Sequence, residues 1–508
     1  MTKPLSKNTV IAVVGAGAMG AGIAQVAAVA GHAVLLLDNR PQAAQVAVDG
    51  LRVQLDKLAA KGKMTVAAAQ AAGQRLQAAS QLSDLAPAGL VVEAIVENLQ
   101  AKQKLFADLE SWVSADCIFG SNTSSISITA IGSALTHPQR LAGLHFFNPA
   151  PLMALVEVVA GLATAPDVVE TLHATATAWG KTAVHAKSTP GFIVNRVARP
   201  YYAEALRLRT EGAGDCATLD AVMRESGGFR MGPFELMDMI GLDVNFAVTR
   251  SVWNAYFNDP RYLPSLIQQE LVDAGYLGKK SGRGYYDYRV GAEKPQPQTE
   301  PSYALPTHIT VCGDTSAAQA LVARLQAAAV LVDRAASMDG RIAQGDDAVL
   351  YVTDGRSATQ RAAENGVPNT VLIDLALDYH KATRTALASA GQCSEMARQS
   401  ACAVLQACGM KVSHLADIPG LAVMRTVAML ANEAADAVYQ GVCTARAADD
   451  AMRLGVNYPA GPLAWADQVG LSNIHVVLTH LNAIYGEDRY RISPLIQRQV
   501  FQGKNFHG

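Results

Sequence analysis

Three glycines and one aspartate near the start of the chain have the types and the spacing that bind a dinucleotide. Gly15, Gly17 and Gly20 form a G-x-G-x-x-G turn. The first glycine of such a turn allows a tight bend, the second lets a pyrophosphate approach the backbone, and the third lets a helix pack closely on a strand. Asp38 follows eighteen residues after Gly20, where a carboxylate accepts hydrogen bonds from an adenosine ribose and repels a 2′-phosphate. The pattern predicts NAD as the cofactor.

Apolar runs on both sides of this turn predict the strand, helix and strand that the motif requires. Residues 9–14 are typical of a buried strand, an alanine-rich stretch continues to about residue 30, and residues 33–37 form a second apolar run. The helix that follows the turn would present free N–H groups to the phosphates. Further strand candidates lie at residues 90–92, 117–119, 141–144 and 155–159. Because ligands of open α/β sheets bind beyond the carboxyl ends of the strands, the polar residues at those ends become site candidates.

Hydride chemistry defines which polar residues such a site needs. An alcohol gives up a hydride to nicotinamide only when its hydroxyl proton also leaves, so the site needs a base that titrates near neutrality. His145, directly after the run at residues 141–144, is the candidate for this base. A carboxylate would hold its tautomer, and neutral donors would stabilise the developing charge on the substrate oxygen. Taken alone, His145 could also be a hydrogen-bonded core histidine, and Ser124 could cap a helix.

Four segments together resemble the L-3-hydroxyacyl-CoA dehydrogenase family. They are SNTSS at residues 121–125, LHFFNP at 144–149, LVEVV at 155–159 and PGFIVNR at 190–196. The resemblance covers residues 9–288 in order. It implies an NAD-dependent oxidoreductase that converts an L-3-hydroxyacyl-CoA to the 3-oxoacyl-CoA. Within the family, the chain is most similar to the long bacterial enzymes that oxidise 3-hydroxyadipyl-CoA in phenylacetate breakdown, with 3-hydroxybutyryl-CoA as the alternative substrate.

The resemblance also implies roles for individual residues. His145 and Glu157 match the family's base and its carboxylate partner, while Ser124 and Asn195 match the donors to the substrate oxygen. A set of charged residues matches positions around the cofactor and the CoA phosphates: Glu97 and Lys102 near the nicotinamide ribose, Lys280 reaching the cofactor, and Lys63 at the CoA phosphates.

Arg199 is a candidate for recognising a substrate with a second carboxylate. It lies four residues after Asn195 and just before Pro200, which should interrupt the helix there. A buried pocket must neutralise a terminal carboxylate, and a guanidinium does so with directed hydrogen bonds. The competing interpretation is an arginine at a surface or between domains.

The second half of the chain repeats part of the first at a constant offset of 229 residues. Between about residues 180 and 242, Pro190-Gly191 aligns with Pro419-Gly420 and Arg196 with Arg425, and no gap is needed. Asn195 corresponds to Met424, so the second copy is expected to be structural and the chain to carry one active site.

The predicted fold is an α/β Rossmann domain followed by an all-helical domain, a degenerate Rossmann-like α/β domain and a second helical domain. The expected boundaries are 1–187 for the NAD-binding domain, 188–290 for the helical domain starting at Ser188-Thr189-Pro190, 291–306 for a linker, 307–415 for the degenerate domain and 416–508 for the duplicated helical domain. Strands of the degenerate domain are expected at 308–312, 328–332, 348–352 and 371–375. The duplicated copy would either pair internally with the first helical domain or add an interface to a homodimer.

Composition excludes several other classes of protein. With 42 Lys and Arg against 44 Asp and Glu, the net charge of −2 offers no basic field for nucleic acid. No apolar run approaches the ~18 residues of a membrane span. Seven cysteines without a Cys-x-x-Cys pair argue against a disulfide framework or a metal site, and favour a cytoplasmic protein. Two rival functions remain: a hydroxyacid or sugar-acid dehydrogenase on the same scaffold, and a redox-inactive NAD-binding relative.

Overall fold

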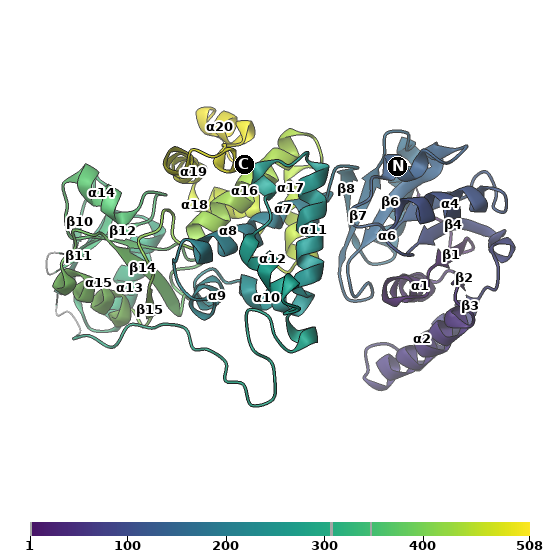
Figure 1. Cartoon of the computed structure of the whole chain (residues 1–508), viewed down its shortest axis with the longest axis horizontal. Helices are drawn as coiled ribbons and strands as arrows, with labels where there is room; N and C mark the ends of the chain where they lie inside the picture. Colours follow the sequence, from purple (N-terminus) through teal and green to yellow (C-terminus); the bar gives the residue numbers. More distant parts are fainter. Residues whose placement is uncertain (1–2, 305–307, 346–347) are drawn as a thin grey trace. The chain divides into compact units, whose positions relative to one another are not determined.

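The computed structural model describes residues 3–304, 308–345 and 348–508 (Figure 1). The expected boundary between linker and second α/β domain, at residues 306 and 307, lies outside the described residues. The chain forms two compact units, one comprising Met1–Arg196 and Gln440–Val456, the other Val197–Tyr439 and Asn457–Gly508. Among the described helices, none combines the length and the apolar character needed to cross a membrane.

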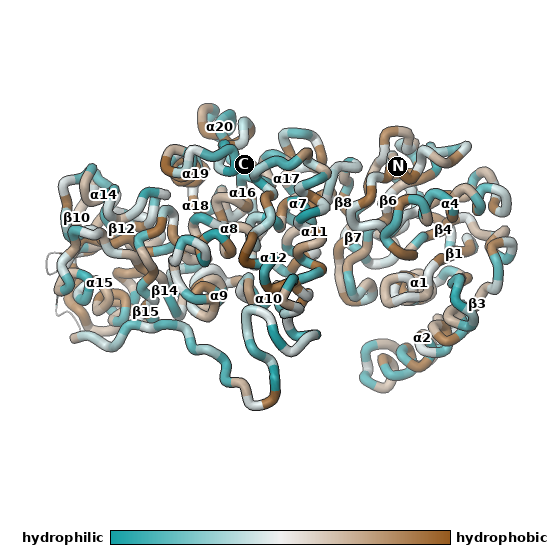
Figure 2. The backbone as a smooth tube through the Cα atoms, in the orientation of Figure 1, coloured by the Kyte–Doolittle hydropathy of each residue, from teal (hydrophilic) through white to brown (hydrophobic). Residues whose placement is uncertain are grey.

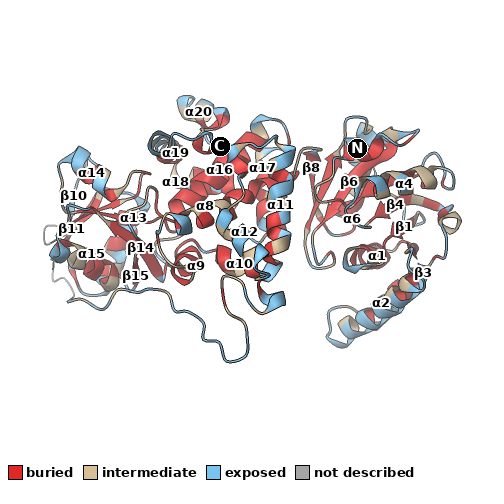
Figure 3. Ribbon diagram, in the orientation of Figure 1, coloured by how far each residue is buried: buried red, intermediate tan, exposed pale blue. Residues whose placement is uncertain are grey.

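An eight-stranded sheet organises the first unit. Its strands are β1 (Val10–Val14), β2 (Val34–Leu37), β3 (Leu76–Ala78), β4 (Ala88–Glu93), β5 (Ile118–Ser121), β6 (Leu141–Phe146), β7 (Leu155–Ala160) and β8 (Thr182–Lys187). Their order is β3-β2-β1-β4-β5-β6-β7-β8, and all neighbours are parallel except β6 and β7. The inner strands are buried (Figure 3), which explains their nearly continuous apolar sequences.

Helices of the first unit pack on this sheet and contribute to its core. They are α1 (Ala18–Ala30), α2 (Ala43–Ala60), α3 (Val66–Arg75), α4 (Leu99–Glu110), α5 (Ile128–Gly132) and α6 (Pro166–Ala178), while the short α7 (Val194–Val197) begins at the end of this unit's first segment. The small residues of α1 let Ile23 and Ala24 lie in one buried cluster with Ile11 and Val13 of β1. The predicted strand–turn–helix–strand unit is therefore present.

A helix from far along the chain completes the first unit. Helix α17 (Ala445–Gly455) packs on β7 and β8. The Lys187 N–H donates to the Val442 carbonyl at 3.0 Å. A Cβ added to Gly455 would lie 2.7 Å from Leu155 Cδ2, so this glycine permits the close approach of α17 to β7.

The helices of the second unit include α8 (Arg199–Thr210) and α16 (Val423–Tyr439), which pack on each other and come from the two repeats. Also present are α9 (Cys216–Glu225), α10 (Pro233–Ile240), α11 (Leu242–Ala255), α12 (Leu266–Asp273), α18 (Pro462–Val469), α19 (Leu471–Tyr485) and α20 (Pro494–Phe501). Helices α8 and α16 are in contact, and the buried guanidinium of Arg425 donates to Glu204 at 2.8 Å and to Glu211 at 2.9 Å. Segments of the two repeats thus pair within one chain.

The predicted helix start at Ser188 is wrong, because residues 188–193 form bends and turns and α7 begins at Val194. Gly191 at φ 75° and Phe192 at φ 47° take left-handed conformations that prevent a continuous helix from Pro190. The predicted interruption at Pro200 is confirmed, since α7 ends at Val197 and α8 begins at Arg199.

A seven-stranded sheet forms the remainder of the second unit, with helices α13 (Ser316–Ala327), α14 (Ala358–Asn365) and α15 (Glu395–Ala407). Its strands are β9 (His308–Cys312), β10 (Leu331–Ala335), β11 (Arg341–Gly345), β12 (Ala348–Val352), β13 (Thr370–Ile373), β14 (Arg384–Ser389) and β15 (Lys411–His414), in the order β10-β9-β11-β12-β13-β14-β15. The strand expected at 328–332 is misplaced: α13 extends to Ala327, and β10 begins only at Leu331. Residues 291–304, which precede this sheet, contain no helix or strand and are mainly hydrophilic (Figure 2).

The repeat at offset 229 extends into the two sheets. His145 opposes Glu157 across β6 and β7, and at the same offset the Asp374 N–H donates to the Ala386 carbonyl. The Lys187–Val442 hydrogen bond also has its counterpart, in which the Ala416 N–H donates to the Ala213 carbonyl at 3.1 Å. Helix α9 packs on β14 as α17 packs on β7. Each repeat therefore lends a helix to the sheet of the other.

Asp374 secures the start of α16. Its buried carboxylate accepts the N–H groups of Ala422, Val423 and Met424 at 2.8–3.0 Å. Three donors at the start of a helix are thereby satisfied by one side chain.

Replacing Asp374 by alanine is expected to destabilise the second unit by about 3 kcal/mol, because buried N–H groups lose their acceptor. A lower urea midpoint, followed by circular dichroism, would record this loss. Asp333→Ala, on an exposed acid of the same sheet, is the control and should unfold like the original protein. Equal midpoints for Asp374→Ala and the control would contradict the assigned role.

Candidate active site

A histidine and a glutamate form a buried pair at the edge of the first sheet. His145 of β6 and Glu157 of β7 are direct partners in the antiparallel register, and His145 Nδ1 lies 2.6 Å from Glu157 Oε2. The two residues are 5% and 0% exposed. Because Nδ1 faces the carboxylate, the tautomer with a proton on Nδ1 is favoured, and Nε2 is left with a lone pair for a substrate.

The second oxygen of Glu157 holds the chain that carries Asn195. Glu157 Oε1 accepts the N–H groups of Ile193 and Val194 at 2.9 and 3.0 Å. The Asn195 side-chain amide donates to the Ser124 backbone carbonyl at 3.3 Å. The structure therefore brings the four residues expected around the substrate, His145, Glu157, Ser124 and Asn195, into one connected region of the first unit.

Glu97 organises the loop that contains Ser124. Its Oε1 accepts from the Thr123 hydroxyl at 2.7 Å and from the Ser124 N–H at 3.0 Å. Burial favours a higher pKa for Glu97, but the Thr123 hydrogen bond and the charge of Lys102 outweigh it and lower the pKa overall. Lys102 is buried in ion pairs with Glu93 at 2.6 Å and Glu97 at 3.3 Å.

The glycine turn has the shape that a pyrophosphate requires. Gly15 has φ 105°, and a Cβ at Gly20 would lie 1.7 Å from the Gly15 carbonyl oxygen, so neither position tolerates a side chain. At Gly17, a Cβ would have no neighbour within 4 Å. The backbone there is accessible to an approaching phosphate, as the fingerprint requires.

Asp38 lies beside this turn, and its carboxylate is held by two neighbours. Its Oδ2 accepts the Ala16 N–H at 2.7 Å, and Arg40 pairs with it at 3.0 Å. The hydrogen bond from Arg40 lowers the pKa of Asp38 to about 2. An ionised carboxylate at this position fits the ribose of NAD and opposes a 2′-phosphate, and the pairing holds Arg40 on the acid.

The other predicted ligand-binding residues lie in different surroundings. Lys63 is exposed in the turn between α2 and α3. Lys280, in the 3-10 turn Lys279–Ser281, pairs with Asp243 at 2.6 Å. Arg199 is buried at the start of α8, where it donates to Thr249 at 3.1 Å and stacks over the Tyr202 ring at 5.0 Å. Lys280 and Arg199 belong to the second unit.

Sequence reasoning missed several supporting residues. Glu93 accepts from the Ser121 hydroxyl at 2.6 Å as well as from Lys102, and the Asn122 side chain accepts the Phe146 N–H at 2.8 Å. An acid that ends the apolar run at residues 90–92, nine residues before a lysine, could have signalled the Glu93–Lys102 pair. Among the described residues, no group of three or more His, Cys, Asp or Glu side chains is arranged to hold a metal ion.

The glycine turn, the adjacent acid and the buried His–Glu pair define an NAD-dependent dehydrogenase built on a Rossmann-type sheet. Comparisons with known proteins agree. A model of the 3-hydroxyacyl-CoA dehydrogenase NAD-binding domain matches residues 10–189, and a model of the 3-hydroxyacyl-CoA dehydrogenase C-terminal domain matches 191–288 and 420–506. A model of the 3-hydroxybutyryl-CoA dehydrogenase reduced Rossmann-fold domain matches 350–419. The chain belongs to the 3-hydroxyacyl-CoA dehydrogenase family.

Individual relatives cover most or about half of the chain. A 3-hydroxyadipyl-CoA dehydrogenase of Escherichia coli K12 is 44% identical over 96% of this chain and 97% of its own length. A probable 3-hydroxybutyryl-CoA dehydrogenase of Bacillus subtilis is 42% identical over 55% of this chain and 96% of its own. The crystal structure of a 3-hydroxybutyryl-CoA dehydrogenase from Escherichia coli K12 has a TM-score of 0.89, 43% identity, and covers 98% of this chain and 99% of its own.

Replacing Asp38 by alanine is expected to reduce the preference for NAD over NADP by about tenfold or more, because an ionised hydrogen-bond acceptor for the ribose is lost and Arg40 is released. Steady-state kcat/KM with each cofactor measures the change. The exposed acid Asp49 of α2 provides the control variant Asp49→Ala. An unchanged ratio in the Asp38 variant would refute its role in cofactor choice.

Proposed function

We propose that this NAD-dependent 3-hydroxyacyl-CoA dehydrogenase acts on an acyl-CoA whose chain ends in a second carboxylate, as 3-hydroxyadipyl-CoA does. The reaction forms the corresponding 3-oxoacyl-CoA. The observation that supports the chemistry is the buried 2.6 Å contact between His145 and Glu157. The similarity to the Escherichia coli enzyme over nearly the whole chain supports the substrate and, with it, a place in phenylacetate breakdown.

In this proposal His145 is the general base. Its Nε2 takes the proton of the substrate 3-hydroxyl group, while Glu157 keeps the proton on Nδ1 and stabilises the imidazolium that forms. NAD, when bound, supplies the nicotinamide that accepts the hydride from C3. The Ser124 hydroxyl and the Asn195 amide would donate to the substrate oxygen, whose negative charge grows as the proton leaves.

The cofactor and CoA contacts follow the same proposal. Gly15, Gly17 and Gly20 would surround the pyrophosphate and Asp38 would bind the adenosine ribose. Glu97 and Lys102 would act near the nicotinamide ribose by holding the Ser124 loop, and Lys280 and Lys63 would contribute charge toward the cofactor and the CoA phosphates.

Arg199 would bind the distal carboxylate of the substrate. It lines a cavity of about 360 Å³ within the second unit, together with the largely apolar side chains of Tyr202, Leu206, Leu263 and Ile267. The cavity also contains Arg207, which pairs with Glu487 at 2.6 Å, and Arg489, which lies 3.6 Å from Glu204. Burial lowers the pKa of Arg199, and an anionic ligand would favour its charged form.

For the second half of the chain, we propose a degenerate Rossmann-like domain over 307–415 and a duplicated helical domain over 416–508 that carry no second active site. His145, Glu157 and Asn195 correspond to Asp374, Ala386 and Met424 at offset 229. The α8–α16 contact supports internal pairing of the helical domains. The seven cysteines are all free thiols, which supports a reducing, cytoplasmic location.

Replacing His145 by alanine is expected to lower kcat by ~10²–10⁴-fold, the usual contribution of a general base, with NAD affinity preserved. NADH formation from a 3-hydroxyacyl-CoA and NADH fluorescence titration measure the two quantities. His185→Ala, on the half-exposed β8 histidine, is the control. Near-full turnover in the His145 variant would overturn the mechanism.

Arg199→Met keeps most of the side-chain volume and removes the charge. We expect kcat/KM for 3-hydroxyadipyl-CoA to fall about tenfold or more, because a charge-assisted hydrogen bond is lost, with little change for 3-hydroxybutyryl-CoA. Arg250→Met, on the exposed arginine next to Thr249, is the matched control. Equal losses on both substrates would refute the role of Arg199 in binding the distal carboxylate.

A further inference from the structure

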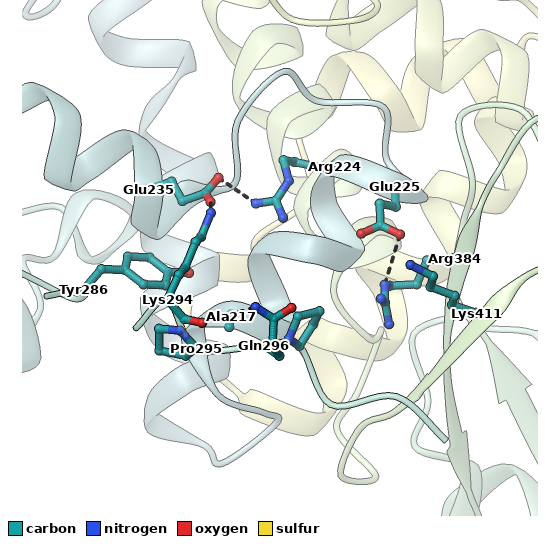
Figure 4. Close-up of a pocket in the computed structure, with 11 residues that line it drawn as sticks. Ala217, Arg224, Glu225, Glu235, Tyr286, Lys294, Pro295, Gln296, Arg384 and Lys411 are labelled. Carbon is teal, nitrogen blue, oxygen red and sulfur yellow. Dashed lines mark hydrogen bonds and ion pairs between the residues drawn. The ribbon is translucent and has the colours of Figure 1, made fainter. Parts of the chain in front are cut away.

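We propose a binding site for a small phosphate-type dianion in the second unit, at the starts of β14 and β15. A cavity of about 210 Å³ lies there between α9, α10, the linker residues 294–297 and the first residues of the two strands (Figure 4). This site is separate from the dehydrogenase chemistry proposed above, because it is built on the second sheet.

The cavity has an excess of positive charge. Its lining includes four cationic side chains and two carboxylates: Arg224, Lys294, Arg384 and Lys411 against Glu225 and Glu235. Glu235 pairs with both Arg224 and Lys294 at 2.6 Å. The remaining acid, Glu225, is paired with Arg384 at 3.3 Å. Within the described residues, the Lys411 ammonium forms no ion pair. Because Glu235 is shared by two cations, the four positive charges of the lining exceed its two negative charges by two.

Arg384 is oriented by neutral groups that leave one nitrogen for a ligand. Its side chain is 2% exposed, and its Nη1 donates to Thr299 at 3.0 Å and Ser413 at 2.7 Å. Nε faces Glu225, while Nη2 has no hydrogen-bond partner among the described residues. A guanidinium fixed in this way presents a free N–H group to an oxyanion.

Lys411 stands next to Arg384 on the same face of the sheet. The two residues are register partners on the parallel strands β14 and β15, and neighbouring partners project to the same side. Figure 4 shows the two side chains next to each other. Two donors of different geometry thus converge on one side of the cavity.

Comparison of the two repeats shows that Arg384 stands where the first sheet has an apolar leucine. At offset 229, Arg384 and Lys411 correspond to Leu155 and Thr182 of the first sheet, where Leu155 lies against Gly455 of α17. Burying a guanidinium at the position of a leucine is unfavourable unless a counter-charge accompanies it. Glu225 at 3.3 Å is the counter-charge of Arg384, and a bound dianion would balance the two positive charges that remain in the lining.

The size of the cavity limits the ligand. A volume of about 210 Å³ gives room for a phosphate group with a short substituent. Pro295 and Pro297 restrict the linker on one side. The charge of the lining and this volume fit inorganic phosphate or the phosphate group of a small phosphorylated metabolite.

Isothermal titration of the full-length protein, saturated with NADH and CoA, tests this site. Inorganic phosphate and glycerol 3-phosphate are the two probes, at constant ionic strength set with chloride. We expect saturable binding of at least one probe, with a dissociation constant raised about tenfold or more in Lys411→Gln, because one charge-assisted contact is lost. Lys381→Gln, at an exposed lysine outside the cavity, should bind like the original protein.

The two probes distinguish the source of the phosphate: binding of both indicates inorganic phosphate, and binding of the ester alone indicates a metabolite. The kcat of Lys411→Gln should remain unchanged, so failure of this site would leave the dehydrogenase proposal intact. Absence of saturation below about 10 mM for both probes, or equal affinities in the Lys411 and Lys381 variants, would overturn the proposal.

Discussion

The geometry of the candidate active site depends on one buried carboxylate, that of Glu157. Glu157 holds the His145 imidazole with one oxygen and the backbone of Ile193 and Val194 with the other. A carboxylate without solvent is tolerated only when its lone pairs are satisfied, so the ring and the chain at residues 193–194 must both be in place. The orientation of the His145 ring and the position of Asn195 therefore follow from a single carboxylate.

The second half of the chain keeps a carboxylate that binds backbone N–H groups at a helix start, but it has no histidine–glutamate pair at the corresponding positions. Asp374 occupies the repeat position of His145, yet it accepts backbone N–H groups at the start of α16, as Glu157 does at the start of α7. A helix start needs acceptors for its first donors wherever it is buried. With Ala386 at the position of Glu157, no imidazole needs an orienting partner, and the shorter acid reaches the backbone from the neighbouring strand.

Local sequence patterns and the family resemblance predicted many residues of the candidate site. Neither predicted contacts between segments that are far apart in the sequence. The glycine turn and Asp38 follow from requirements within forty residues, and the family pattern placed Asn195 beside Ser124. No periodicity could show that α17 covers β7, because that contact depends on a glycine, Gly455, three hundred residues after Leu155. The helix start at Ser188 was misplaced because Ser-Thr-Pro also precedes turns, and here the left-handed Gly191 and Phe192 follow.

The second sheet differs from the first at the place where a dinucleotide would bind. In the first sheet, β1 lies between β2 and β4, all parallel, and cofactors of such sheets bind where the strand order reverses. In the second, β11 is inserted between β9 and β12 and runs antiparallel to both. The chain that enters β11 therefore lies at the carboxyl edge that a cofactor needs. The described strands of the second sheet therefore do not reproduce the parallel β2-β1-β4 arrangement of the first sheet.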